Sequence, residues 1–298
     1  MADPRKPPPP IMKLPLSSVL PPRDSAGREF SFSNADFERV RKLIYQHAGI
    51  SLSPVKQDMV YSRLARRLRA TGKQTFAEYL DFLEKNGGDE WEKFVNSLTT
   101  NLTSFFREPH HFPIFAEHLR KLGSRRPIRV WCSAASTGEE PYSIAITVAE
   151  TFGNNCSHVS IIASDLDTNV LATAQKGVYP VERVEKLSPE RLRKFFLRGT
   201  GAQEGYVSVR PELKNMIQFQ RLNLLDSSYA VKGPLDVIFC RNVMIYFDKP
   251  TQYKILARFA PMMQPDGLMF AGHSESFLHA ADLFKSQGKT VYTLASAR

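Results

Sequence analysis

The stretch that decides the fold is Ile128-Arg-Val-Trp-Cys-Ser-Ala-Ala-Ser-Thr-Gly-Glu-Glu-Pro-Tyr-Ser143. Its first five residues predict a short apolar strand, and the small residues after them let the backbone approach a ligand closely. A helix is predicted next, over Glu140–Phe152. This order is typical of the first unit of a doubly wound α/β domain, in which ligands bind at the carboxyl ends of the strands.

The chain continues the same alternation beyond this unit. Further strands are predicted at Val159–Ala163, Met216–Gln220, Leu235–Cys240, Leu268–Ala271 and Thr290–Leu294, with helices at Asp167–Gln175 and Thr251–Met262. Residues 178–214 interrupt the pattern and predict an inserted helix with a small antiparallel hairpin. We therefore expect an α/β doubly wound domain over residues 121–298 that carries a β-subdomain at about 178–214.

The part before this domain has a different character. Residues 30–120 show helical spacing of apolar residues, beginning after the cap signal Ser33-Asn34, and nothing that resembles a strand ladder. They predict a small helical domain and a linker. Residues 1–29 hold eight of the twenty prolines, and we expect them to form a disordered tail.

Composition excludes several classes of protein. The chain of 298 residues has no run of 18 apolar residues, so we expect no membrane insertion. Its first residues lack the apolar core of a signal peptide, so we do not expect secretion. Cys132, Cys156 and Cys240 form no CxxC pair, which argues against a zinc knuckle or a disulfide framework. A cytoplasmic location is the expectation.

The net charge of +10 is unevenly placed. Residues 30–129 hold 17 basic and 11 acidic residues, which accounts for +6 of it. Arg63, Arg66 and Arg67 fall at i, i+3 and i+4 and therefore share one helical face. We predict that this face docks an acidic partner, with nucleic acid, anionic lipid and an acidic protein all open at this point.

Polar residues follow each predicted strand of the α/β domain. Asp165 ends the second strand, where an acidic residue is the usual acceptor of ribose hydroxyls. The loop after the first strand lacks GxGxxG and the Walker lysine, and a carboxylate at Glu139 would repel phosphate. These features favour a cationic cofactor without phosphate, such as S-adenosylmethionine.

Long motifs carry a resemblance to the chemotaxis receptor methyltransferases of the CheR type. They are Asn101–Phe112, Ser133–Ala145, Ala163–Asp167, Asn223–Leu225, Phe239–Phe247 and Gly272–Glu275, and the resemblance runs from about residue 30 to the end. It implies the class I methyltransferase fold and the transfer of methyl from S-adenosylmethionine to glutamate side chains of a chemoreceptor cytoplasmic domain. The products are glutamyl methyl esters and S-adenosylhomocysteine.

The resemblance also implies roles for residues. The positions matching the family's cofactor-binding set are Asn101, Thr103, Arg107, Glu139, Asp165, Asn223, Leu224, Arg241 and Asn242. Arg107 and Tyr246 resemble the catalytic residues near the transferred methyl group. The β-subdomain resembles one that captures a receptor C-terminal pentapeptide on an edge strand.

Two other functions remain as alternatives from the sequence: a nucleic-acid methyltransferase with a basic helical clamp, and a cofactor sensor without activity. The basic helix lacks interleaved aromatic residues for base stacking, so we expect no nucleic-acid partner. His110 and His111 look like a metal pair, but neighbouring histidines in a helix point in different directions, so we expect no metal. A monomer is the expected state.

Overall fold

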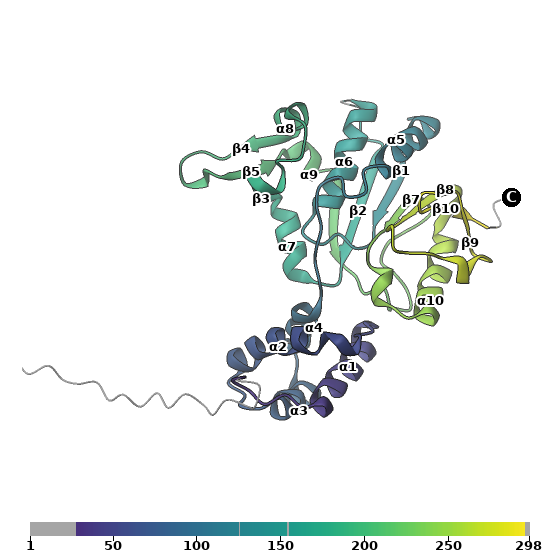
Figure 1. The fold of residues 1–298 in the computed structure, drawn as a ribbon. Coiled ribbons are helices and arrows are strands. Elements are labelled where there is room, and N and C mark those ends of the chain that lie inside the picture. Colours follow the sequence, from purple (N-terminus) through teal and green to yellow (C-terminus); the bar gives the residue numbers. More distant parts are fainter. Residues whose placement is uncertain (1–27, 125, 154, 296–298) are drawn as a thin grey trace, which may run out of the picture.

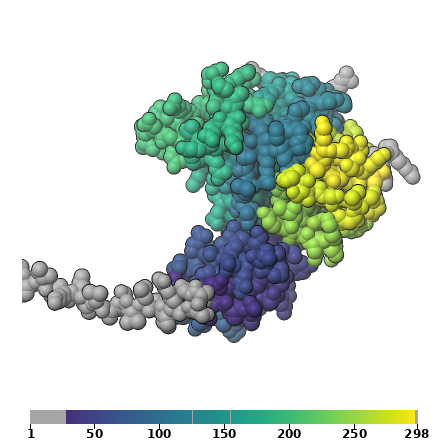
Figure 2. Space-filling view, viewed as in Figure 1, coloured from purple at the N-terminus to yellow at the C-terminus, as the bar shows by residue number. Residues whose placement is uncertain are grey.

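The computed structural model describes residues 28–124, 126–153 and 155–295, and the prediction of a disordered tail lies outside this range except for Arg28 and Glu29. A helical domain and an α/β domain form two lobes, and a small β-subdomain projects from the second (Figures 1 and 2). The fold class predicted from the sequence is confirmed. No helix in the described ranges has the length and apolarity needed to cross a membrane.

The helical domain consists of four amphipathic helices around one apolar core. They are α1 (Asn34–Ala48), α2 (Gln57–Thr71), α3 (Phe76–Asn86) and α4 (Glu90–Leu98), with a short 3-10 turn, η1 (Pro54–Lys56), before α2. Ser33 and Asp36 form a reciprocal capping box that satisfies free backbone N–H groups at the start of α1. The apolar faces meet in the core through residues such as Val40, Ile44, Leu64, Phe76 and Phe94.

The central sheet has the order β6-β2-β1-β7-β8-β10-β9. Its strands are β1 (Ile128–Cys132), β2 (Val159–Asp165), β6 (Ile217–Arg221), β7 (Leu235–Cys240), β8 (Met263–Ala271), β9 (Phe284–Ser286) and β10 (Val291–Leu294). β6, β2, β1, β7 and β8 are parallel, whereas β10 pairs antiparallel with β8 and β9. The strand order reverses between β1 and β7, and polar loops meet at the carboxyl ends of these strands.

Helices cover both faces of the sheet. α5 (His111–Leu122), α6 (Glu139–Phe152) and α7 (Thr168–Lys176) flank one core, and α10 (Lys249–Phe259) flanks the other. The sequence predicted that residues up to 120 belong to the helical domain and its linker, but α5 packs in a core of the α/β domain. Its Phe115 lies edge-on against Phe239 of β7, with ring centroids 5.3 Å apart. The core of the helical domain ends at Leu98, and residues 99–110 cross to the sheet.

The insertion at 178–214 forms a three-stranded antiparallel sheet rather than a lone hairpin. Its order is β3-β5-β4, from β3 (Val178–Pro180), β5 (Tyr206–Val209) and β4 (Phe196–Arg198), and α8 (Pro189–Phe195) and α9 (Pro211–Lys214) accompany it. The remaining short turns are η2 (Val181–Arg183), η3 (Gly201–Gln203), η4 (Met244–Tyr246), η5 (Ala260–Met262) and η6 (Leu278–Ala280).

The basic face of α2 differs from the sequence prediction. Arg67 makes a two-pronged ion pair with the buried Glu90, at 2.8 and 2.7 Å, and Tyr79 donates to the same carboxylate. Arg63 donates to the carbonyl oxygen of Thr99 at 2.6 Å. Both guanidinium groups are therefore engaged by partners within the protein, which differs from the open docking face predicted from the sequence. Arg66 is exposed.

This difference predicts unequal effects of two neighbouring substitutions on stability. Arg67→Ala leaves the Glu90 carboxylate buried without its cation, and it should lower the free energy of unfolding by about 3 kcal/mol. Arg66→Ala should change it by less than about 0.5 kcal/mol, because the side chain is exposed. Urea denaturation measures both, and equal losses would contradict the structural role of Arg67.

Candidate active site

A cavity of about 450 Å³ lies between the helical domain and the carboxyl ends of the sheet strands. Such a volume suits a nucleoside-sized ligand. Nine of the ten residues predicted for cofactor binding or catalysis line it: Asn101, Thr103, Arg107, Asp165, Asn223, Leu224, Arg241, Asn242 and Tyr246. The sequence missed the contribution of the helical domain, which adds Ile50, Ser51, Leu52, Lys56 and Met59 to the lining.

Glu139 is the predicted residue that the cavity lining does not include, and its neighbour Glu140 lines the cavity instead. The Glu139 carboxylate accepts from the Thr137 hydroxyl at 2.6 Å and lies 3.3 Å from the Arg183 guanidinium. Successive residues of a helix point about 100° apart, and here only the second of the two glutamates lines the cavity. Glu139 does not line the cavity, so its role in cofactor binding stays a prediction.

Asp165 ends β2 and faces the cavity. Its Oδ2 accepts the backbone N–H of Ser136 at 2.8 Å, and its Oδ1 accepts that of Asp167 at 3.0 Å. Burial raises the pKa of this carboxyl to about 6, although the backbone donors act in the opposite direction. Each oxygen keeps a second lone pair, so the carboxylate can still accept hydroxyl donors from a ligand.

Contacts between the two domains close one side of the cavity. The Asn223 side-chain amide donates to the carbonyl of His47 at 3.1 Å, and the Ser51 N–H donates to the carbonyl of Tyr246 at 2.8 Å. The hydroxyl of Tyr45 donates to Asp248 at 2.8 Å. These bonds tie the end of α1 and the loop after it to the loops that follow β6 and β7.

The linker from Thr99 to Arg107 forms another wall. Asn101 donates to Asp167 at 3.0 Å and accepts, through its carbonyl, from the Ser136 hydroxyl at 3.2 Å. Arg107 donates one N–H to the carbonyl of Leu102 at 2.8 Å, and its remaining donors are available at the cavity. The linker therefore brings an arginine fork to the loop that carries Tyr246.

Tyr246 also lines the cavity. Its hydroxyl donates to the Thr100 carbonyl at 3.2 Å. Burial raises the pKa of the phenol, while the charge of Arg107 lowers it. The phenol therefore stays protonated at neutral pH and can donate its hydrogen bond to the Thr100 carbonyl.

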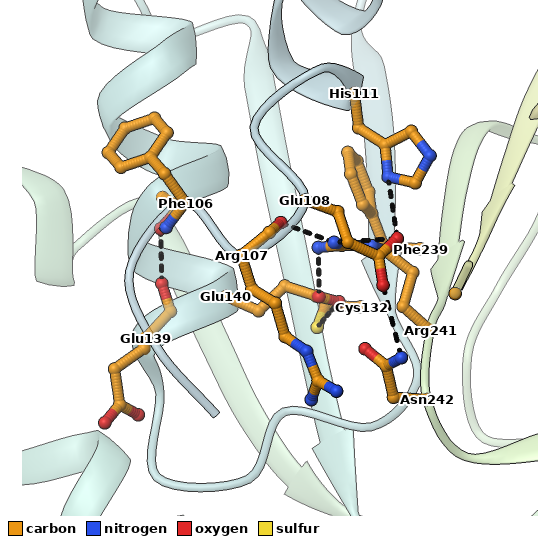
Figure 3. A network of polar contacts seen from close by, with 12 residues as sticks. Phe106, Arg107, Glu108, His111, Cys132, Glu139, Glu140, Phe239, Arg241 and Asn242 are labelled. Atoms are coloured by element: carbon orange, nitrogen blue, oxygen red, sulfur yellow. Dashed lines mark hydrogen bonds and ion pairs between the residues drawn. The ribbon is translucent and has the colours of Figure 1, made fainter. Parts of the chain in front are cut away.

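Arg241, predicted to bind the cofactor, has a fully buried side chain. It donates to Glu140 at 2.7 Å and to the backbone carbonyl of Arg107, and it lies 3.4 Å from Glu108 (Figure 3). These protein groups take up donors of its guanidinium. The sequence did not predict roles for Glu108, Glu140 and the buried Glu275. Only the folded chain brings these carboxylates to Arg241 and Asn242.

The lining fits S-adenosylmethionine. Asp165 offers carboxylate lone pairs suited to ribose hydroxyls, and the loop after β1 offers the small residues Ser133 and Ala134. Apolar side chains such as Leu224 suit the flat base. The loop carries no glycine-rich phosphate cradle.

Two family models match this chain. The model described as "CheR methyltransferase, SAM binding domain" matches residues 101–293, and "CheR methyltransferase, all-alpha domain" matches residues 35–99. The chain belongs to the CheR methyltransferase family. As a family member, the protein is a methyltransferase that uses S-adenosylmethionine as its methyl donor.

Relatives of this family member span nearly its whole described length. The chemotaxis protein methyltransferase of Escherichia coli (strain K12) is 54% identical over 266 residues, which is 89% of this chain and 92% of that protein. Chemotaxis protein methyltransferase 2 of Pseudomonas aeruginosa is 51% identical over 269 residues, 90% and 96% of the two chains. A nucleic-acid methyltransferase is therefore not favoured.

The raised pKa of Asp165 predicts how cofactor binding depends on pH. Hydroxyl donors and a sulfonium charge favour the ionised carboxylate, so binding should lower this pKa from about 6 and release a proton. Affinity should then be constant above about pH 7 and fall by up to about tenfold per pH unit below about pH 6.

Calorimetry across this pH range measures the effect. Asp165→Asn is the matched control, because it cannot titrate: its affinity should be weaker by about 2 kcal/mol and should lose the dependence on pH. Wild-type affinity that stays constant down to about pH 5 would contradict this role of Asp165.

Proposed function

We propose that the protein methylates glutamate side chains of a chemoreceptor cytoplasmic domain, forming glutamyl methyl esters and S-adenosylhomocysteine. The observation that carries this proposal is the cavity whose lining combines Arg107, Tyr246 and Asp165. The names of the relatives, chemotaxis protein methyltransferases, support a chemoreceptor as the substrate.

The proposed reaction requires little acid–base chemistry. A free glutamate has a pKa near 4.3 and is already a nucleophile at neutral pH, so the protein needs no general base. When bound, S-adenosylmethionine supplies an electrophilic methyl group on a positively charged sulfur. The attack removes two opposite charges, which water would stabilise in the ground state, so the site must exclude water and align the carboxylate.

The residues of the cavity fit these tasks. Asp165, with Asn223 and Leu224, would hold the nucleoside, and Asn101 and Thr103 would hold the rest of the cofactor from the linker side. The free donors of Arg107 suit the planar carboxylate of a substrate glutamate. Tyr246 would contact the same carboxylate or the methyl group.

The rim of the cavity supports an acidic, amphipathic receptor helix as the docked segment. Leu102 and Ile245 line the cavity while remaining 77% and 51% exposed, so they offer apolar contact beside the glutamate. Lys56 and Arg66 are exposed on the adjoining helical domain. Of the three arginines predicted to dock the receptor, we assign this role to Arg66 alone.

The β-subdomain offers a second contact with a receptor. β4 is an edge strand of its sheet, and Leu197 on it is 42% exposed. An extended receptor C-terminal pentapeptide would pair with such an edge through main-chain hydrogen bonds. Tethering raises the local concentration of receptor glutamates without changing the active site.

One labelling experiment tests the proposed reaction. Radiolabelled S-adenosylmethionine is offered to a receptor cytoplasmic fragment with and without its last five residues, and to RNA and DNA. The label should appear on the receptor and leave in alkali, because methyl esters hydrolyse readily there. Removing the five residues should slow labelling. Label on nucleic acid, or label stable in alkali, would contradict the proposed function, and equal rates for both fragments would contradict the tether.

The docking role predicts a charge-dependent change in substrate binding. Arg66→Glu should raise the KM for the receptor fragment by about threefold to tenfold at low salt, with little change in kcat and in cofactor affinity. The difference from wild type should shrink at high salt. Lys285→Glu makes the same charge change on β9 at the sheet edge and should leave KM unchanged. Equal KM values for both variants would argue against docking through Arg66.

A further inference from the structure

Glu108 lies behind the active site and belongs to a network that the proposed reaction does not use. Its side chain is 9% exposed. One carboxylate oxygen accepts from the backbone N–H of His273 at 3.1 Å, from the ring of His273 at 3.0 Å and from the side-chain amide of Asn242 at 3.3 Å. The other lies 3.4 Å from Arg241. Glu108 thus joins the linker to the loops after β7 and β8.

The backbone around Arg107 is strained. Phe106 has φ 51° and Glu108 has φ 53°, and both values lie in the left-handed region that side chains disfavour. Such a conformation persists only where surrounding contacts hold it. Arg107 stands between these two residues, so the direction of its side chain depends on what holds them.

Three polar side-chain contacts hold this segment, in addition to the backbone bonds from Arg107 to Ser104 and from His111 to Glu108. The N–H of Phe106 donates to the Ser143 hydroxyl at 2.9 Å, and the carbonyl of Arg107 accepts from Arg241. The Glu108 carboxylate supplies the third. Figure 3 shows the Arg107 carbonyl facing the Arg241 guanidinium, whereas the Arg107 side chain extends in another direction and makes no marked contact with the residues drawn. The network therefore grips the backbone and leaves the side chain for the cavity.

Asn242, also at a left-handed φ of 58°, is held from both sides. Its side chain donates to Glu108, and its backbone N–H donates to Glu275 at 2.9 Å. Glu275 also accepts the N–H groups of Val243 and Met244, at the start of the turn that ends in Tyr246. Glu108 thus connects the Arg107 segment to the Tyr246 loop, in addition to the bonds of Arg241 to the Arg107 carbonyl and of Tyr246 to the Thr100 carbonyl.

We propose that Glu108 is a positioning residue, which sets the orientation of the Arg107 guanidinium relative to Asn242 and Tyr246. This inference rests on the proposed function, in which Arg107 orients the substrate carboxylate. Glu108 touches neither cofactor nor substrate in this role.

The charges of the cluster suit a permanently ionised Glu108. Burial alone would raise its pKa, but the His273 donors, the Arg241 charge and Asn242 lower the pKa to about 2. Donor atoms of Glu108, His110 and His111 lie within 4.8 Å of one another, as at a metal site. The Arg241 cation beside Glu108 disfavours a metal ion there and already balances the carboxylate.

A double-mutant cycle tests the inference. Glu108→Gln places an amide N–H against the donors of His273 or Arg241, so it should lower kcat for receptor methylation by about tenfold to hundredfold. In an Arg107→Lys background the same change should cost less than about twofold, because an ammonium has no planar fork to orient. Equal losses in both backgrounds would overturn the inference.

A second readout does not depend on activity. Amide hydrogen exchange of residues 101–110 should become faster in Glu108→Gln, because the strained segment loses one of its three side-chain anchors. Glu90→Gln alters another buried, ion-paired carboxylate in the helical domain and should leave this segment unchanged. Unchanged exchange in Glu108→Gln would also overturn the inference.

If Glu108→Gln does not fold, His273→Ala replaces it in the same cycle, because its side chain is 68% exposed and supplies one Glu108 donor. A smaller loss of kcat, again absent with Arg107→Lys, is expected. Failure of the proposed function would appear differently, as absence of receptor labelling by the wild-type protein.

Discussion

The rest of the site depends on the hydrogen bonds and ion pairs of the buried Arg241 guanidinium. A cation with no exposed side-chain surface requires partners, and it finds them in Glu140 at the start of α6 and in the Arg107 carbonyl of the linker. Arg241 itself follows β7. Three segments far apart in the sequence are thereby joined at the carboxyl end of the sheet. Removing one partner would leave an uncompensated buried charge, so their arrangement is strongly constrained.

This constraint explains why the cavity lies between two domains. The linker that Arg241 holds is the same chain that enters from the helical domain, and Arg63 of α2 fastens its beginning by donating to Thr99. Hydrogen bonds from Asn223 to His47 and from Ser51 to Tyr246 fasten the opposite side. The domain proposed to meet the receptor therefore also forms a wall of the cofactor cavity.

The alternation of strands and helices predicted the fold class and the parallel strands. Convergence of the strand ends at one edge of the sheet pointed to residues such as Asp165 and Asn223, whereas only the resemblance to the family pointed to linker residues such as Arg107. Nine of the ten residues predicted for the site line one cavity. The sequence did not predict contacts that depend on a partner distant in the chain. Sequence spacing does not show that Glu140 rather than Glu139 lines the cavity, and Arg67 looks exposed until Glu90 is placed beside it. β9 is only three residues long and has no periodicity to detect. α5 has the apolar pattern of any amphipathic helix, and only packing shows which core it joins.

The central claim is that Arg241 is a structural cation that shapes the cavity, while Asp165 and Arg107 face the ligands. A crystal structure of the protein with S-adenosylhomocysteine tests this most directly. The product should lie in the cavity with its ribose hydroxyls on Asp165, and the Arg241 guanidinium should keep its bonds to Glu140 and the Arg107 carbonyl. A product bound outside the cavity, or an Arg241 side chain turned away from Glu140 to contact the product, would contradict the claim.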